Sequence, residues 1–176
     1  MVYNLATMSS STQQHRQAAP THLRFSVLTI SDTRTLETDH SGQLLCSSLT
    51  EAGHQLVERQ IVPDEAELIA GRVCQLCAAQ DLDSLLLTGG TGISPRDRTP
   101  EAVRPLLDLE LTGFGELFRS LSYAEIGPAA MLSRAFAGRR GGVLIFCLPG
   151  SRNAVQLAID KILLPELPHL VHHSRG

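Results

Sequence analysis

SLLLTGGTG occupies residues 84–92 and is followed by TPEA at residues 99–102, and this stretch decides the fold. The first five residues form a short apolar run that leads directly into glycines, a pattern typical of a buried strand. Thr99 and Pro100 are residue types favoured at an N-cap and at the first helical position, so a helix is expected to begin there. The stretch therefore predicts a strand, a glycine loop and a helix in succession.

The same alternation extends on both sides of this stretch. Apolar runs predict strands at residues 23–30 and 142–148, and alternation of apolar and polar residues predicts one at 55–62. Apolar residues at helical spacing predict helices at 41–52, 66–79, 114–125 and from 151 onward. With 176 residues, 43% of them hydrophobic, the chain can form one domain with a sizeable core. We therefore expect a single α/β domain at residues 23–173, preceded at residues 1–22 by a disordered leader rich in Ser, Thr and Gln.

Polar residues follow each of the four predicted strands. They are residues 31–32, 63–64, 89–97 and 149–151. In an α/β domain the strands are mostly parallel, and the loops after their carboxyl ends gather on one edge of the sheet. We therefore expect the chemistry of the protein to lie on that edge.

The glycine loop and the charged residues after it are suited to a phosphorylated ligand. Gly89, Gly90 and Gly92 let backbone N–H groups approach a phosphate closely. Their spacing matches neither GxxxxGK[ST] nor GxGxxG, so a tight structural turn is the alternative. In Arg96-Asp97-Arg98, a carboxylate between two cations offers a magnesium ligand and phosphate-neutralising charge, although a surface salt-bridge cluster would have the same sequence.

Asp64 and Ser151 each have a structural and a functional interpretation. Asp64 and Glu67 form an N-terminal capping signal, which accounts for Asp64 without any chemistry. At the end of a predicted strand, however, Asp64 would share the sheet edge with Asp97, and two carboxylates suit a hard cation in nucleotidyl transfer. Ser151 can cap the last helix or, together with the helix N-terminus, hold a phosphate.

The composition narrows the class of partner. The net charge of −3 and the lack of a basic cluster in the sequence argue against nucleic acid and against an anionic membrane surface. No apolar segment has the length of a membrane span. Lys161 is the only lysine, so arginine, backbone amides or a metal ion must meet the charge of a phosphorylated ligand. A small-molecule partner is therefore expected.

The cysteines and histidines do not form a recognisable catalytic set. Cys74 and Cys77 make a CxxC motif without a second pair at zinc spacing, so cysteines buried on a helix are the favoured interpretation. Four cysteines scattered through apolar contexts are not typical of a disulfide framework and favour the reducing cytoplasm. His169, His172 and His173 offer adventitious metal binding, but a solvated C-terminus is the simpler interpretation.

A series of motifs extends these patterns over most of the chain. They are TGGTG at 88–92 with RDRTPEA at 96–102, DHSG at 39–42, IVPDE at 61–65, GFGE at 113–116, SRA at 133–135 and LPGS at 148–151. In this order they resemble the MoaB/MogA family of molybdopterin adenylyltransferases, which act in molybdenum cofactor biosynthesis, over residues 23–170. The compact length and FRSLSYAEIG at 118–127 are more similar to the MoaB branch.

The resemblance implies a three-layer α/β/α sandwich with a mostly parallel sheet, assembled as a homotrimer or homohexamer. It also implies Mg²⁺- and ATP-dependent adenylylation of molybdopterin, and contacts with upstream and downstream proteins of the pathway. Asp64 and Asp97 match the family's two catalytic, magnesium-positioning aspartates. The positions that match its substrate and nucleotide site are Gly89, Gly90, Thr91, Gly92, Ser94, Pro149, Gly150 and Ser151, with Asp32 and Glu116 in support.

Two other functions are compatible with the same motifs. A non-catalytic molybdopterin-binding or carrier protein would keep the fold without turnover, and an oligomeric scaffold would neither bind nor react. The presence of both Asp64 and Asp97 favours the enzyme. In that case the molybdopterin phosphate attacks the α-phosphorus of ATP and pyrophosphate leaves, with no covalent enzyme intermediate.

Overall fold

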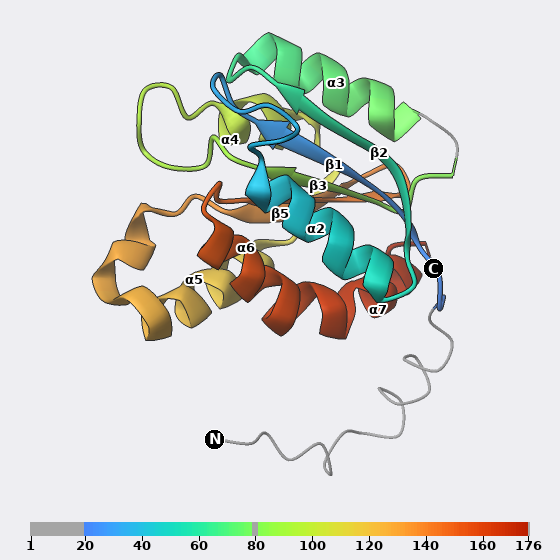
Figure 1. Ribbon diagram of the computed structural model, residues 1–176. Helices are drawn as coiled ribbons and strands as arrows, with labels where there is room; N and C mark the ends of the chain where they lie inside the picture. Colours follow the sequence, from blue (N-terminus) through green and yellow to red (C-terminus); the bar gives the residue numbers. More distant parts are fainter. Residues whose placement is uncertain (1–19, 79–80, 176) are drawn as a thin grey trace.

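The most apolar segments of the sequence form the centre of a six-stranded sheet with the order β2-β1-β3-β6-β5-β4 (Figure 1). The computed structural model describes residues 20–78 and 81–175. Its strands are β1 Arg24–Ile30, β2 Gln55–Val62, β3 Ser84–Thr88, β4 Leu109–Glu110, β5 Phe136–Arg140 and β6 Val143–Leu148. Strands β2, β1, β3 and β6 run parallel, whereas β5 and β4 are added antiparallel. The predicted mostly parallel α/β sheet is confirmed.

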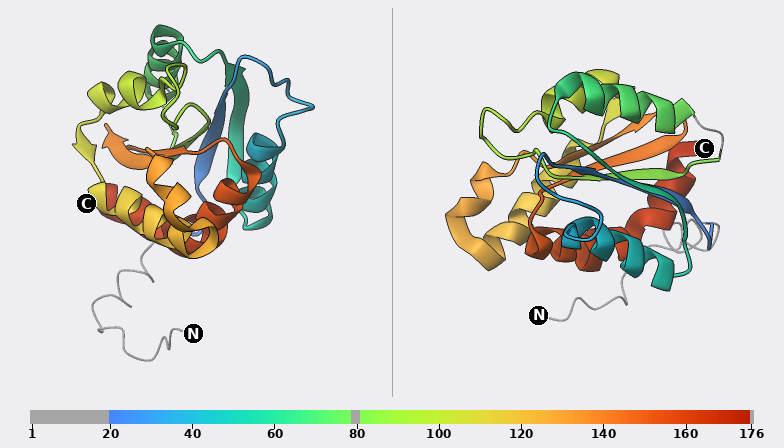
Figure 2. Two further views of the ribbon diagram at one scale, coloured as in Figure 1. Left: turned by 90° about the vertical axis from the view of Figure 1, so that its left-hand side faces the viewer. Right: turned by 45° about the horizontal axis from the view of Figure 1, so that its top comes forward.

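Helices cover both faces of this sheet, as the two views of Figure 2 show. Helices α3 and α4 lie on one face, and α2, α5, α6 and α7 lie on the other. The bounds of these elements are α2 His40–Glu51, α3 Ala66–Ala78, α4 Thr99–Val103, α5 Thr112–Ile126, α6 Arg152–Ala158 and α7 Leu164–Arg175. Shorter helical turns occupy η2 Arg104–Leu106, η3 Gly127–Leu132 and the π-helical η4 Ile159–Leu163. The three-layer sandwich is therefore present.

The apolar runs of the central strands fill two separate cores. In β1, Val27 belongs to the core beneath α2, α5, α6 and α7, and Leu28 belongs to the core beneath α3 and α4. Strand β6 divides in the same way, with Phe146 in the first core and Ile145 in the second. Successive side chains of a strand point to opposite faces, so a sheet covered on both sides needs a continuous apolar run. Burial of this surface is the main stabilising term of the fold.

Strands β4 and β5 were not predicted, and their sequence explains why. β5 reads FAGRR, in which a glycine and two arginines interrupt the apolar pattern. A Cβ at Gly138 would lie 2.6 Å from the carbonyl oxygen of Leu109, so glycine is what allows β4 to pair there. The guanidinium groups of Arg139 and Arg140 donate to the carbonyls of Ser174 and Leu106. Neither feature leaves a periodic signal.

Two sequence predictions about the ends of helices and of the chain need correction, and others fall outside the described residues. Thr99 does not cap α4, because its hydroxyl donates to the carbonyl of Gly89 at 2.9 Å and no side-chain cap is present on that helix. The C-terminus is not a solvated tail, since α7 continues to Arg175 with Leu167 and Val171 buried. The predicted leader lies outside the described residues up to residue 19, and so does residue 79 of the helix predicted at 66–79.

Within residues 20–78 and 81–175, none of the helices combines the length and the apolar character that crossing a bilayer demands.

Candidate functional site

The carboxyl ends of β1, β3 and β6 meet at Gly89. This residue has a φ of +107°, and a Cβ there would lie 2.3 Å from the carbonyl oxygen of Ile30. Its amide donates to the carbonyl of Leu148 at 3.0 Å. Only glycine tolerates both the backbone conformation and this close approach. The glycine loop is therefore fixed at the middle of the sheet edge, where the sequence predicted a site.

The predicted second ligand-binding loop, residues 149–151, lies directly against this turn. The hydroxyl of Thr88 donates to the carbonyl of Pro149 at 3.0 Å, and that of Ser41 donates to the carbonyl of Gly150 at 2.8 Å. A Cβ at Gly150 would lie 3.4 Å from the Cα of Gly89. The two loops that follow β3 and β6 are thus brought together, as the topology predicted.

Asp64 and Asp97 reach the glycine loop from two directions. A Cβ built on Gly90 would lie 3.0 Å from Oδ2 of Asp64, and one built on Gly92 would lie 2.8 Å from Oδ2 of Asp97. Both carboxylates therefore lie against the backbone of the same loop, at glycines that are two residues apart. The glycines at these positions leave room for the carboxylate oxygens.

Backbone amides hold the carboxylates in place. Asp97 accepts from the amide of Ser94 at 2.8 Å, which closes the turn of the loop. The carboxylate of Asp64 accepts from the amide of Arg98 at 3.1 Å. Among the described residues this is the only hydrogen bond of that carboxylate, so Asp64 does not cap α3. Asp32 accepts from the amide of Asp64 at 3.1 Å and pairs with Arg96. The capping interpretation of Asp64 is therefore not supported.

The pKa values of Asp64 and Asp32 are shifted in opposite directions. Burial raises the pKa of the Asp64 carboxyl, and the charges of Asp97 and Asp32 add to that effect, against the amide of Arg98 and the charge of Arg96. The pKa of Asp32 is lowered, first by the amide of Asp64 and then by the Arg96 guanidinium. Negative charge at Asp64 is therefore short of compensation, which is the environment that a bound cation relieves.

Arg134 fixes the glycine loop from the opposite side. Its Nε donates to the carbonyl of Gly92 at 2.6 Å, and its Nη2 donates to the carbonyl of Asp97 at 2.8 Å. Its own amide donates to the carbonyl of Thr91 at 2.9 Å, and its guanidinium also pairs with Glu101. One arginine thus orients the stretch that carries Asp97. Sequence reasoning noted the motif at 133–135 but assigned no role to Arg134.

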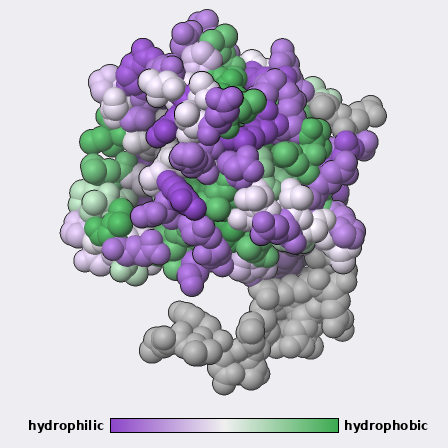
Figure 3. Space-filling model, in the orientation of Figure 1, coloured by the Kyte–Doolittle hydropathy of each residue, from purple (hydrophilic) through white to green (hydrophobic). Residues whose placement is uncertain are grey.

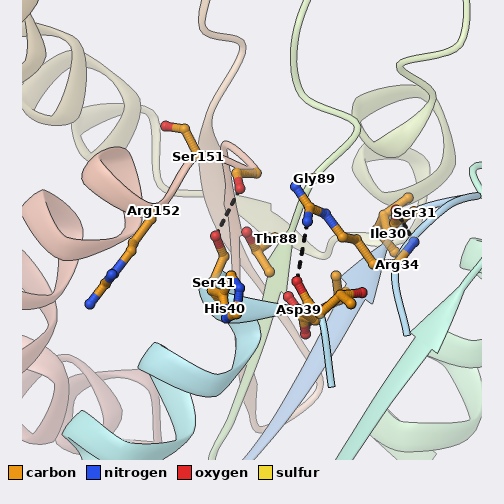
Figure 4. A pocket seen from close by; sticks show the side chains of 13 residues that line it. Ile30, Ser31, Arg34, Asp39, His40, Ser41, Thr88, Gly89, Ser151 and Arg152 are labelled. Carbon is orange, nitrogen blue, oxygen red and sulfur yellow. Dashed lines mark hydrogen bonds between the residues drawn. The ribbon is translucent and has the colours of Figure 1, made fainter. Parts of the chain in front are cut away.

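A pocket of about 310 Å³ opens on the α2 and α6 side of the glycine loop (Figure 4). Gly89, Gly150 and Ser151 line it, together with residues to which the sequence assigned no binding role. These are Thr29, Ile30, Ser31, Arg34, Thr38, Asp39, His40, Ser41, Thr88 and Arg152. Ser151 caps α6 by accepting from the amide of Ala154 at 3.3 Å, so its capping role is confirmed. The amino-terminal ends of α2 and α6 both border this pocket, which suits an anion.

A buried ion pair fixes the wall of the pocket. Asp39 is 3% exposed, and its carboxylate accepts from the hydroxyl of Thr29 at 2.7 Å, the amide of Gly42 at 2.9 Å and the guanidinium of Arg59 at 3.0 Å. Arg59 also donates to the carbonyl of Leu36 at 3.1 Å. These bonds join β1, β2 and the start of α2. They set the position of the helix end that faces the pocket.

Other predicted residues do not contribute side chains to this pocket. Thr91 is buried and its hydroxyl has no partner among the described residues, so its contact with the site runs through the backbone. Ser94 is exposed, and its hydroxyl accepts from the amide of Arg96 at 3.3 Å. Glu116 is exposed on α5 and is not among the residues lining the pocket. Its proposed binding role stays a prediction.

The four thiols are free, and two of them are less buried than expected. Cys46 and Cys147 lie in the core, but Cys74 and Cys77 of the CxxC motif are only half-buried on α3. Burial raises the pKa of Cys77 to about 11, and the thiolate is the reactive form. The CxxC motif therefore lacks the environment of a redox site.

Comparison with known proteins decides the family. The family model described as "Probable molybdopterin binding domain" matches residues 26–169. Molybdenum cofactor biosynthesis protein B of Bacillus subtilis (strain 168) is 50% identical over 166 residues, which cover 94% of this chain and 98% of that protein. The chain belongs to the MoaB/MogA family. The namesake protein of Halalkalibacterium halodurans is 52% identical over 162 residues, covering 92% of this chain and 95% of that one.

Solved structures of the family share the fold described above. A crystal structure of molybdenum cofactor biosynthesis protein B superposes with a TM-score of 0.86 at 51% identity, covering 89% of this chain and 98% of that one. The tungsten cofactor synthesizing protein MoaB from Pyrococcus furiosus superposes with a TM-score of 0.81 at 38% identity, covering 90% and 100%. Family membership assigns the chain to molybdenum cofactor biosynthesis.

Proposed function

We propose that the protein is a molybdopterin adenylyltransferase, in which the phosphate of molybdopterin attacks the α-phosphorus of ATP and pyrophosphate leaves. One observation carries this proposal: the carboxylates of Asp64 and Asp97 both lie against the glycine loop, at Gly90 and Gly92. The bond between the α-phosphorus and the bridging oxygen to the β-phosphate breaks as the new phosphate–phosphate bond forms. Such transfer needs positioning and charge stabilisation rather than a protein nucleophile.

The carboxylates fit a magnesium ion held jointly with ATP. Among the described residues, no group of three or more His, Cys, Asp or Glu side chains is close enough to hold a metal by itself. Mg²⁺ is commonly bound by one or two carboxylates together with substrate phosphates and water, and it then neutralises phosphate charge. Asp64 and Asp97 are the residues that would hold it. A bound cation would stabilise the charged form of Asp64, which burial and the neighbouring carboxylates disfavour.

The pocket on the other side of the loop is suited to the phosphorylated pterin. Arg34 and Arg152 lie on opposite sides of it, with Ser41 and Thr88 between them (Figure 4). Guanidinium groups and helix amino-termini both favour a phosphate group. The glycine loop separates this pocket from the carboxylates, so a pterin phosphate and a nucleotide bound on the two sides would meet at Gly89 and Gly90. Asp32 and Ser94 support the carboxylate side through Asp64 and Asp97.

An exposed apolar patch supports assembly of several copies. Leu117, Ile126, Met131 and Leu132 of α5 and η3 are all exposed, and Figure 3 shows hydrophobic side chains gathered over these elements. Patches of this kind on a monomer mark contact surfaces. A homotrimer or homohexamer built through this patch is part of the proposal. The four free thiols fit the reducing cytoplasm, where the proposal places the reaction.

The deciding experiment measures molybdopterin-dependent release of pyrophosphate from Mg-ATP. We expect turnover by the wild type and a loss of roughly 100-fold or more in Asp64→Asn and Asp97→Asn. The amide oxygens of both variants can still accept from the amides of Arg98 and Ser94, so the loop keeps its turn. Asp81→Asn, an exposed change just before β3 at the opposite edge of the sheet, is the matched control and should retain full activity.

The alternative is a molybdopterin-binding or carrier protein without turnover, which the same pocket would serve. A wild-type protein that binds molybdopterin but releases no pyrophosphate would establish that function. A protein that neither binds nor reacts would point to the scaffold.

A further inference from the structure

Three histidines gather on the last two turns of α7. The helix is anchored there, because Val171 is buried, Arg139 donates to the carbonyl of Ser174 at 3.2 Å, and Arg175 pairs with Asp83. The segment is thus an ordered part of the fold. Its histidines are held at defined positions relative to one another.

His169 and His173 form a close pair on one face of this helix. They are four residues apart, and their Nε2 atoms lie 3.0 Å from each other. The ring centroids are 4.6 Å apart with the planes at 80°. Nδ1 of His169 lies 3.1 Å from Oε2 of Glu166, one turn earlier. His172 contacts the ring of His173 at a centroid distance of 5.7 Å.

We propose that His169 and His173 are a bidentate site for a divalent transition metal of the Ni²⁺, Cu²⁺ or Zn²⁺ class. With metal–nitrogen bonds of about 2.05 Å, two ligands lie about 2.9 Å apart at a 90° angle and about 3.3 Å apart at a tetrahedral angle. The observed separation of 3.0 Å falls in that interval. In the metal-free protein, one ring donates a hydrogen bond to the other along the same line.

Glu166 prepares His169 for this role. When Nδ1 of His169 carries the proton and donates it to the carboxylate, the lone pair is left on Nε2, where the metal binds. A carboxylate behind a histidine ligand fixes the tautomer and raises the basicity of the ring. Nε2 of His173 then carries the proton of the hydrogen bond in the metal-free protein, and metal binding moves that proton to Nδ1, which leaves the Nε2 lone pair for the metal.

The site is open and distinct from the proposed magnesium site. No third His, Cys, Asp or Glu side chain completes it among the described residues. Imidazole suits Ni²⁺, Cu²⁺ and Zn²⁺, whereas Mg²⁺ takes oxygen ligands. A bound metal ties together two successive turns at the end of α7. It therefore opposes fraying of the segment that carries Ser174 and Arg175.

The test titrates tag-free full-length protein with NiCl₂, ZnCl₂ and MgCl₂ by calorimetry, beside thermal melts with and without excess NiCl₂. We expect one Ni²⁺ and one Zn²⁺ per chain, no Mg²⁺ in the absence of nucleotide, and a melting temperature raised by Ni²⁺. His169→Gln and His173→Gln should each weaken Ni²⁺ binding at least about tenfold and abolish the thermal shift. His172→Gln removes a neighbouring imidazole from the same helix and should bind like the wild type.

Two results would overturn the proposal. One is a wild-type protein with no Ni²⁺ or Zn²⁺ binding, and the other is equal loss of affinity in His172→Gln and His173→Gln. Because His173→Gln keeps the contact between Glu166 and His169, a folding defect in His169→Gln does not remove the test. Pyrophosphate release has no part in either result, so the outcome is independent of the proposed adenylyl transfer.

Discussion

The two sides of the Gly89–Gly90 turn differ in charge. On the side of α3 and α4, three carboxylates gather, and the pKa of Asp64 is raised by burial and by its acidic neighbours. On the side of α2 and α6, Arg34 and Arg152 are among the residues that line a pocket bordered by two helix amino-termini. One loop thus separates a place that attracts cations from a place that attracts anions. Charges segregated in this way are suited to holding two reactants whose phosphates must meet.

The largest effect should come from a change that breaks both sides at once. Gly89→Ala puts a Cβ 2.3 Å from the carbonyl oxygen of Ile30 at a φ of +107°. Neither backbone can move without disturbing the centre of the sheet, so we expect a loss of more than about 4 kcal/mol in the free energy of unfolding. Urea denaturation followed by circular dichroism measures it.

Gly141→Ala is the matched control, because its φ is +56° but nothing lies within 4 Å of the added Cβ. Positive φ alone should cost about 1 kcal/mol. Equal losses of unfolding free energy in the two variants would show that the close contact with Ile30 does not contribute to stability. The Gly89–Gly90 turn would then not be a rigid element shared by the two sides.

The next effect should fall on the pocket side alone. Asp39→Ala leaves the buried guanidinium of Arg59 without its carboxylate and removes the acceptor of the Gly42 amide at the start of α2. Breaking a buried pair in this way costs about 3 kcal/mol. We also expect weaker molybdopterin binding, because the end of α2 that borders the pocket is no longer fixed. Thermal melts and a binding titration check the two parts.

Asp81→Ala provides the comparison, since the pair of Arg24 and Asp81 is exposed and should contribute less than about 1 kcal/mol. If Asp39→Ala were as mild as that change, the pocket wall would be held by packing rather than by the ion pair.

The same contrast separates what the sequence could predict from what it could not. Asp64 and Asp97 were placed on one edge because each follows a predicted strand of a parallel sheet, the partly buried β2 and the fully buried β3. Arg34 and Arg152 were missed, and His40 of the DHSG motif was given no role, because their places depend on the path of residues 31–39 and on where α2 and α6 begin. Those positions follow from tertiary bonds such as those of Asp39, which have no sequence period.

Two details of the fold were hidden for a related reason. β5 was missed because Gly138 serves the approach of β4 and its arginines reach distant carbonyls, so neither follows a strand pattern. The capping interpretations of Asp64 and Thr99 were chemically reasonable, yet both side chains are used at the glycine loop instead. Tertiary hydrogen bonds at the glycine loop thus replaced the helix caps that local sequence favours.

The smallest expected effect is on stability, and it should differ in sign between Asp64 and Asp32 on the carboxylate side. In Asp64 the folded pKa is raised, so the folded state binds more protons than the unfolded state from the ordinary carboxyl pKa of 3.8 up to the folded pKa. Stability falls as the pH rises through that window, and the cost remains at pH 7. Asp64→Asn should therefore raise the free energy of unfolding at pH 7 by less than about 1 kcal/mol, or about 1–3 °C in Tm, while abolishing turnover.

Asp32→Asn should shift stability in the opposite direction, because the pKa of Asp32 is lowered and its charged form is favoured in the folded state. That stabilisation is present above the ordinary pKa and is lost as the pH falls through the folded pKa. Differential scanning calorimetry of both variants at pH 7, without nucleotide or metal, gives the two signs directly. A lower Tm for Asp64→Asn would mean that its charge is already compensated by Arg96 and Arg98. The carboxylate side would then have no unmet negative charge to attract a cation, and the contrast between the two sides of the loop would be lost.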